Sequence, residues 1–331
     1  MGLVELMVGV VIGMIGVLVI FQTMSTWGGR TATTMSGGDA QTSGALGVFY
    51  LERDIKQAGW GFGTAASAEG GPNMGCTVSG QGYILSPVVI TQTAVDEPDQ
   101  ITVLYGTSPI FTAAGKFSNG TSTLIKTDSW GGFKTGDRVI LGSGGQCRLA
   151  TIGTPPSRNL PLAYASGSGS VLASGIVFNM GAAIVRARWE VNGGLRWGDN
   201  AATETISPVA DGVVDLQAEY GFGDLLTGGV TWQDPSVAVT NWNRLKAVRF
   251  AILVRSKNYE KPGTDGCPAT PVRPTWFGQN FIMRNLDGGI NDTDVTACPV
   301  AIDVNDWHHY RYEVFERVVP LRNVMWGGIG E

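Results

Sequence analysis

The sequence predicts an α+β protein in which a long N-terminal helix carries a β-rich head. One observation is an apolar run, since every residue from Leu3 to Phe21 is apolar or glycine except Glu5. Another is the alternation of apolar and polar residues that recurs through the last two thirds of the chain, which is typical of strands. The third is composition: 15% of residues are charged, against about 25% in typical domains, and 48 of 331 are glycine. Together these observations indicate strands and long loops behind one helix.

The apolar run is long enough to cross a membrane, because its 19 residues rise about 1.5 Å each in a helix. A carboxylate in such a segment is costly without a partner, so Glu5 needs an explanation. A secretory signal peptide does not fit, because no basic region precedes the run and no small-residue cleavage site follows it. A plain anchor fits the length but leaves Glu5 unexplained. A helix that lies first in the membrane and later in a filament would offer Glu5 the amine of Met1, its own or a neighbour's.

The next segment predicts a helix with a break. Residues 25–38 are a poor helix because two glycine pairs invite bends. The pattern then recovers, with Val48, Leu51 and Ile55 at i, i+3 and i+7, an amphipathic stripe that Gly59 stops. We therefore expect an interrupted helix whose second half packs under a sheet. The division that follows is a hydrophobic transmembrane helix over 1–24, its amphipathic continuation over 25–58 and the β-rich head over 59–331.

Strand patterns occupy most of the head. They cover residues 101–106, 121–128, 137–143, 146–153, 175–180, 183–191, 195–197, 209–223, 245–258 and 310–323. Asn192-Gly193-Gly194 predicts a hairpin turn. Alternation around Phe250 predicts a half-buried strand. Residues 60–100 and 259–309 are expected to be long loops with little regular structure.

The four cysteines favour two disulfides. None lies in a CxxC pair, so the spacing does not suit a zinc ribbon or a redox motif. An even number at long spacing behind a membrane segment suggests disulfides in an oxidising compartment, with four free buried thiols as the alternative. Three pairings are possible. Cys76–Cys147 with Cys267–Cys298 has the fewest crossings and is the pairing that we expect.

Several stretches resemble a known family. The run MGLVELMVGVVIGMIGVLVIFQ, and above all the LVEL of Leu3 to Leu6, resembles the N-terminus of mature type IV pilins and of type II secretion pseudopilins. LERDIKQAG at 51–59 and VFERVVPLRN at 314–323 resemble the corresponding regions of PilW-like minor pilins. The family's usual proline near position 22 is absent here.

The resemblance implies a type IV pilin fold, with the long helix packed on an antiparallel sheet head with disulfide-pinned loops. It implies a structural filament subunit, with Glu5 and the methylated Met1 amine acting in assembly. It also implies that part of the helix melts in the filament, which without the proline points to Gly13 and Gly16; close helix packing is the alternative role for these glycines. The implied partners are copies of the chain, other pilins, the inner membrane, prepilin peptidase and the assembly platform. The implied location is the inner membrane of a bacterium and then the extracellular pilus.

Two other functions stay open beside this one. A type II secretion pseudopilin of the J type shares the N-terminal motif and a head of similar size. A membrane-anchored binding protein of the cell envelope would use its long, cysteine-pinned loops to hold a surface, a sugar or DNA. An envelope enzyme has no supporting constellation, because the chain lacks GxSxG, P-loop and HExxH motifs. We therefore expect neither catalysis nor a cofactor.

The remaining polar clusters suggest no strong site. His308 and His309 are adjacent and would face opposite ways in a strand, so we expect surface or satisfied histidines rather than metal ligands. A polar turn offers oxygens for Ca²⁺, but its spacing is not that of an EF-hand; its residues are Asp287, Asn291, Asp292 and Asp294. Arg186 and Arg188 share one strand face with Glu190, and we expect this face to be solvated rather than to form a track for DNA. A net charge of −5 gives no general attraction for nucleic acid.

Overall fold

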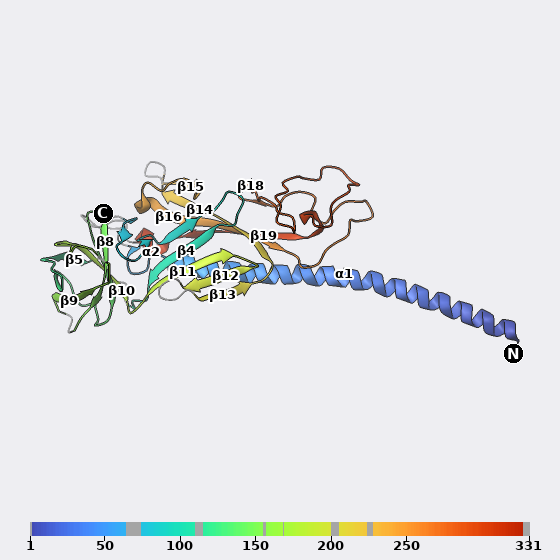
Figure 1. Cartoon of the computed structure of the whole chain (residues 1–331), viewed down its shortest axis with the longest axis horizontal. Coiled ribbons are helices and arrows are strands. Elements are labelled where there is room, and N and C mark those ends of the chain that lie inside the picture. Colours follow the sequence, from blue (N-terminus) through green and yellow to red (C-terminus); the bar gives the residue numbers. More distant parts are fainter. Residues whose placement is uncertain are drawn as a thin grey trace. The chain divides into compact units, whose positions relative to one another are not determined.

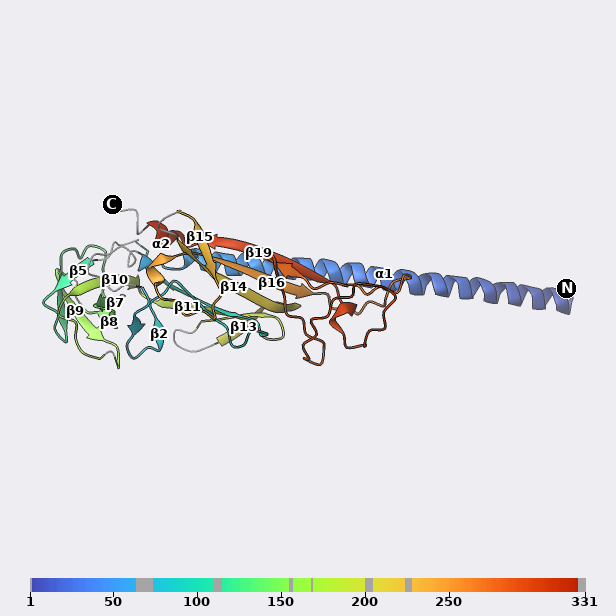
Figure 2. The ribbon, with the colours of Figure 1, turned by 90° about the horizontal axis from the view of Figure 1, so that it is seen from above.

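The computed structural model describes residues 2–63, 74–109, 115–154, 157–167, 169–199, 205–223 and 228–326 (Figures 1 and 2). The chain forms two compact units. Unit 1 consists of residues 1–44 and 254–313, and unit 2 of residues 45–253 and 314–331. The helix α1 and the strands β16 and β19 contribute residues to both units, and each unit is described by itself.

The helix α1 runs without a break from Leu3 to Gln57 (Figure 1). The interruption predicted at 25–38 is therefore wrong. In unit 1 the hydroxyl of Ser36 accepts hydrogen bonds from the backbone N–H groups of Lys257 (2.8 Å) and Asn258 (3.2 Å). The Asn258 side chain also donates to the carbonyl of Ala32 at 2.9 Å. These tertiary bonds hold the turn that precedes the second glycine pair, and they override the weak propensity of the segment.

Six strands of unit 2 close into a small barrel. The strand order β8-β7-β10-β5-β6-β9 returns to its start because β9 also pairs with β8. The barrel strands are β5 (Gly115–Ser118), β6 (Leu124–Thr127), β7 (Arg138–Ser143), β8 (Gln146–Ile152), β9 (Asn159–Tyr164) and β10 (Gly175–Gly181). Buried apolar side chains such as Phe117, Leu141 and Leu160 form its core. The expected single-sheet head is thus only part of the architecture.

The predicted loop over 60–100 contains short strands instead. The strands β1 (Thr77–Val78) and β2 (Tyr83–Ile84) pair with each other, and β1 also pairs in parallel with the start of β8, where Val78 lies opposite Cys147. The strand β3 (Val88–Thr91) pairs with β4 (Gln100–Gly106). The Gly- and Ser-rich composition hid these strands because each has only two to four residues.

A five-stranded antiparallel sheet in unit 2 has the order β13-β12-β11-β4-β3. Its remaining strands are β11 (Ile184–Val191), β12 (Leu195–Asp199) and β13 (Thr205–Ala210). The predicted hairpin at 192–194 is confirmed, and it places Trp189 opposite Trp197.

A four-stranded sheet has the order β15-β14-β16-β19. Its strands are β14 (Val213–Gly223), β15 (Val230–Gln233), β16 (Leu245–Arg255) and β19 (Tyr312–Pro320). The half-buried strand predicted around Phe250 is wrong, because every residue from Phe250 to Val254 is buried. An alternating pattern with small or apolar residues at the outward positions, such as Ala251 and Leu253, allows both faces to be covered.

The last described elements are short. They are η2 (Trp242–Arg244), β17 (Thr275–Trp276), β18 (Gln279–Asn280), η3 (Trp307–His309) and α2 (Arg322–Trp326). Between Ser256 and Arg311 the chain of unit 1 is mostly irregular, as predicted for 259–309.

Candidate functional site

The first half of α1 is an apolar surface that no other described residue covers. Met7–Met24 has a mean hydropathy of 2.3, and none of its 18 residues is buried. Its largest side chains are more than half exposed, up to 73% for Phe21. At about 1.5 Å per residue this segment is about 27 Å long, close to the thickness of a bilayer core. Apolar all round, it is suited to an apolar environment supplied from outside the chain.

The predicted assembly residues lie at the start of this segment. The backbone of Glu5 belongs to α1. The side chain of Glu5 and the whole of Met1 fall outside the described residues, so their pairing stays a prediction. A Cβ atom built on Gly13 or Gly16 would meet nothing within 4 Å. The described residues therefore provide no close packing at these two glycines.

The last turns of α1 are held by the rest of unit 2. Leu51 and Ile55 are fully buried and Val48 is 3% exposed, which confirms the predicted stripe. Gly47 allows the close approach, because a Cβ there would lie 2.9 Å from a methyl group of Leu195. The stripe is thus a packed seam between helix and sheet.

A buried carboxylate in this seam fixes the rotation of α1 about its own axis. The indole N–H groups of Trp189 and Trp197 both donate to Oδ2 of Asp54 at 3.1 Å, and the guanidinium of Arg53 lies 3.2 Å from Oδ1. Burial raises the pKa of Asp54, while Arg53 and the two indoles oppose that rise. The paired strands β11 and β12 therefore both form a hydrogen bond with the same residue of α1, Asp54.

An asparagine from the end of the chain caps α1. Nδ2 of Asn323 lies 3.4 Å from the carbonyl oxygen of Lys56, 3.2 Å from that of Gln57 and 3.0 Å from that of Ala58. These are carbonyls that a helix end leaves without partners. Gly59 follows with a φ of 79°, as expected for a helix stop. No local sequence pattern predicts this cap, although VFERVVPLRN ends at Asn323.

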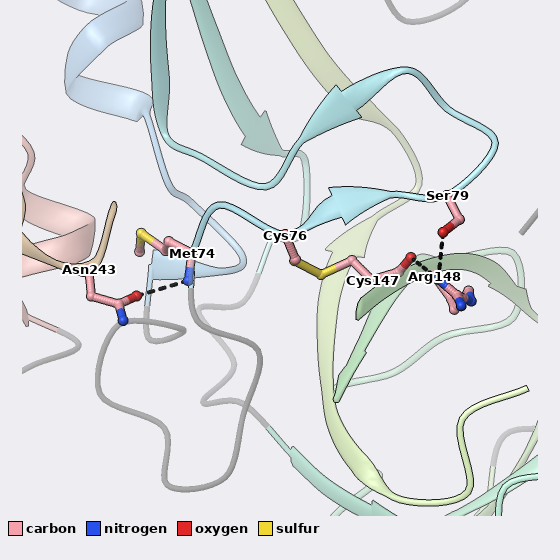
Figure 3. Close-up of a disulfide and its surroundings, with 6 residues drawn as sticks. All are labelled: Met74, Cys76, Ser79, Cys147, Arg148 and Asn243. Atoms are coloured by element: carbon pink, nitrogen blue, oxygen red, sulfur yellow. Dashed lines mark hydrogen bonds between the residues drawn. A yellow bond between two sulfur atoms is a disulfide. The ribbon is translucent and has the colours of Figure 1, made fainter. Parts of the chain in front are cut away.

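The cysteines pair as Cys76–Cys147 and Cys267–Cys298, the arrangement with the fewest crossings. The Cα–Cα distances of 5.8 and 5.2 Å are ordinary for disulfides. Figure 3 shows that the first disulfide ties the segment before β1 to β8. On the same stretch the guanidinium of Arg148 donates to the hydroxyl of Ser79 at 2.5 Å. The disulfide and this bond together fix β1 on the barrel.

The structure does not gather the candidate calcium ligands. Asp292 and Asp294 both face Arg273, at 3.8 and 3.3 Å. Asn291 instead donates to Asp306 at 2.9 Å, and Asp287 accepts a bond from its own turn. Among the described residues, no group of three or more His, Cys, Asp or Glu side chains could hold a metal.

The histidines lie in the 3₁₀ turn η3, so the expectation of strand geometry is wrong. Both are 2% exposed. The ring of His308 stacks on Trp307 with centroids 3.7 Å apart, and its Nδ1 lies 2.5 Å from Asp306. Nδ1 of His309 lies 3.1 Å from the carbonyl of Glu260. Together they form part of the packed interior of unit 1.

The arginines of β11 are not on a solvated face, contrary to the prediction. Arg188 pairs with Glu190 at 3.3 Å, and each of these side chains is only 19% exposed. The guanidinium of Arg186 lies 4.5 Å from the centre of the Tyr83 ring. The β1–β2 hairpin causes the difference, because it brings Tyr83 over the strand.

Comparison with known proteins finds a family model that matches part of the chain. The family model described as Type IV Pilus-assembly protein W matches residues 182–323. The predicted resemblance to PilW-like proteins is confirmed. The PilW match includes β11, the Trp189–Trp197 hairpin and the capping residue Asn323, and it supports a role related to type IV pili.

Two further comparisons add little to the PilW match. A solved type IV-like pilin from Thermus thermophilus aligns over 86% of this chain and 96% of its own, at 11% identity and a TM-score of 0.35. That similarity is too low to carry an argument. No curated protein matches the chain.

Proposed function

We propose that the chain is a structural subunit of a type IV pilus filament and not an enzyme. The helix over 1–24 inserts into the inner membrane of a bacterium, and the same helix then polymerises with neighbouring copies and other pilins into the extracellular pilus. The observation that carries this proposal is the uncovered apolar segment Met7–Met24. Contiguous apolar surface of this extent marks a membrane or protein interface.

Glu5 distinguishes a filament subunit from a plain anchor. In lipid the carboxylate is costly, so an anchor has no use for it. Among packed helices it can pair with the Met1 amine, which offsets part of the desolvation cost. A buried pair of this kind sets the register between neighbouring subunits, and removing one partner leaves an unpaired charge that costs about 3–5 kcal/mol.

The glycines of Met7–Met24 support a helix that can unfold locally. Each glycine destabilises a helix by about 1 kcal/mol relative to alanine. Gly13 and Gly16 have no packing neighbour within the described chain. In the proposed filament this stretch melts locally and lets the fibre lengthen. Prepilin peptidase and the assembly platform would act on the chain before this stage.

Replacing Glu5 tests the proposal. The variant Glu5→Ala should insert into the inner membrane as the wild type does, but its amount in filaments sheared from the cell surface should fall at least tenfold. Asp39→Ala is the matched control, because Asp39 is an exposed acid of the same helix. Quantitative blotting of membrane and sheared fractions gives both numbers.

Other outcomes would point elsewhere. Normal assembly of Glu5→Ala would contradict the proposed role of Glu5. A chain found in the membrane but never in sheared filaments would indicate an anchored binding protein. Filaments that appear only when a type II secretion system is overexpressed would indicate a pseudopilin.

A further inference from the structure

Unit 2 contains a cavity of about 550 Å³ on one face of the five-stranded sheet. Because side chains alternate along β11, this face, which carries Arg186, is opposite to the face that carries Trp189. The β1–β2 hairpin forms one wall, and β3, β4 and β11 form the floor. The volume lies within the range of about 300–1,000 Å³ that is usual for small-molecule sites. No residue of this cavity belongs to α1, so the inference below does not rest on filament assembly.

Strand register brings the polar lining together. Gln100 lies opposite Thr91, and Leu104 lies opposite Arg186. Because side chains alternate along β4, Gln100, Thr102 and Leu104 share one face. The floor therefore offers an amide and two hydroxyls beside an apolar surface.

Arg186 is the charged residue of the lining. Its guanidinium stacks over the Tyr83 ring at 4.5 Å, and burial lowers its pKa. Among the described residues no salt bridge to Arg186 is found. The carboxylate of Asp199 acts on its charge at longer range, while Glu190 is engaged by Arg188 at 3.3 Å and by the Gln100 amide at 3.1 Å. A half-buried guanidinium in this state has its fork of N–H donors available for an anion.

The wall that holds Arg186 is rigid. Tyr83 belongs to the β1–β2 hairpin, which the Cys76–Cys147 disulfide and the bond between Arg148 and Ser79 fix to the barrel (Figure 3). Because the ring is held in place, the guanidinium is held before any ligand arrives. Pre-organisation of this kind reduces the cost of binding.

We propose that this cavity binds an acidic sugar, with the sugar carboxylate on Arg186, its hydroxyls on Thr91, Thr102 and Gln100, and its apolar ring face on Leu104 and Tyr83. One guanidinium in the lining matches one carboxylate. The lining contains no second cation for a doubly charged phosphate, because the neighbouring Arg188 lies outside it and is paired with Glu190. A neutral sugar would bring no anion to the guanidinium of Arg186. The ligand class is therefore a uronic-acid unit, such as those at the ends or branches of surface polysaccharides.

Calorimetric titration of the full-length protein in detergent micelles tests this inference. The probes are D-glucuronate, D-glucose and inorganic phosphate. Glucuronate should bind at least about tenfold more tightly than either of the others, because only it uses the guanidinium and the hydroxyls together. Absent glucuronate binding, or phosphate binding of equal strength, would overturn the acidic-sugar assignment.

Matched variants locate the binding. Arg186→Gln should weaken glucuronate binding at least about tenfold. Arg196→Gln removes the same charge from the neighbouring strand β12 without touching the cavity lining, and it should bind as the wild type does. Equal affinities for the two variants would place any binding elsewhere. Thr102→Val, which keeps the side-chain shape, should weaken binding about threefold even if Arg186→Gln fails to fold.

Discussion

The two ends of α1 differ in what covers them. Near its C-terminal end, Leu51 is fully buried, while near its N-terminal end Leu18 is 62% exposed. The sequence pattern follows this difference, because the last turns are apolar on one stripe and the first turns are apolar all round. One helix therefore contains a seam that its own chain covers and an apolar surface that nothing in the described part of the chain covers.

The acidic residues Asp54 and Glu5 show the same difference between the two ends of α1. Asp54 finds its partners, two indoles and Arg53, within unit 2. Glu5 lies beside an uncovered apolar segment, and the proposed partner is an amine at the start of this chain or another. The difference teaches that a buried carboxylate can specify either a fold or an assembly, depending on whose side chains surround it.

The largest expected effect separates the two leucines. Leu51→Ala should lower the free energy of unfolding of the head by about 2–5 kcal/mol, because it leaves a cavity in a packed seam. Leu18→Ala should change the same quantity by less than about 0.5 kcal/mol, because nothing in the described chain covers Leu18. Denaturant unfolding in micelles, followed by tryptophan fluorescence, measures both. Equal losses would mean that the two ends of α1 do not differ as argued.

A smaller effect concerns the glycines of the exposed end. The double variant Gly13→Ala, Gly16→Ala should stabilise the helix by about 1 kcal/mol per site. Filaments that carry it should extend less than wild-type filaments at the same force in an optical trap. The double variant Gly37→Ala, Gly38→Ala is the control, because a Cβ there also meets nothing within 4 Å. Identical force–extension curves for all three would place the yielding stretch elsewhere.

Local patterns predicted those elements whose signal is local. The stripe through Val48, Leu51 and Ile55 has helical spacing and packs as expected. The Asn-Gly-Gly turn specifies its own hairpin. The length of the apolar run from Leu3 to Phe21 is sufficient to predict a helix. Each of these features is contained in fewer than about 25 consecutive residues, so no knowledge of distant segments was needed.

The missed features depend on distant segments. The barrel closes because β8 pairs with β9 as well as with β7, a choice that neither strand's sequence reveals. Short strands such as β5 are too brief to show periodicity. Nothing near Arg186 predicts that Tyr83, about 100 residues earlier, will cover it. Tertiary contacts likewise decided whether the helix would continue past its glycine pairs.

Thiol labelling tests the central claim, that the first half of α1 is covered by other molecules in the cell. All four native cysteines are in disulfides, so Val17→Cys and Val237→Cys each introduce a single free thiol. Val17 is 65% exposed and Val237 is 54% exposed in the isolated chain. A membrane-impermeant maleimide should label Val237→Cys in purified filaments within minutes, and Val17→Cys only after denaturation. Equal labelling of the two thiols in intact filaments would contradict the account.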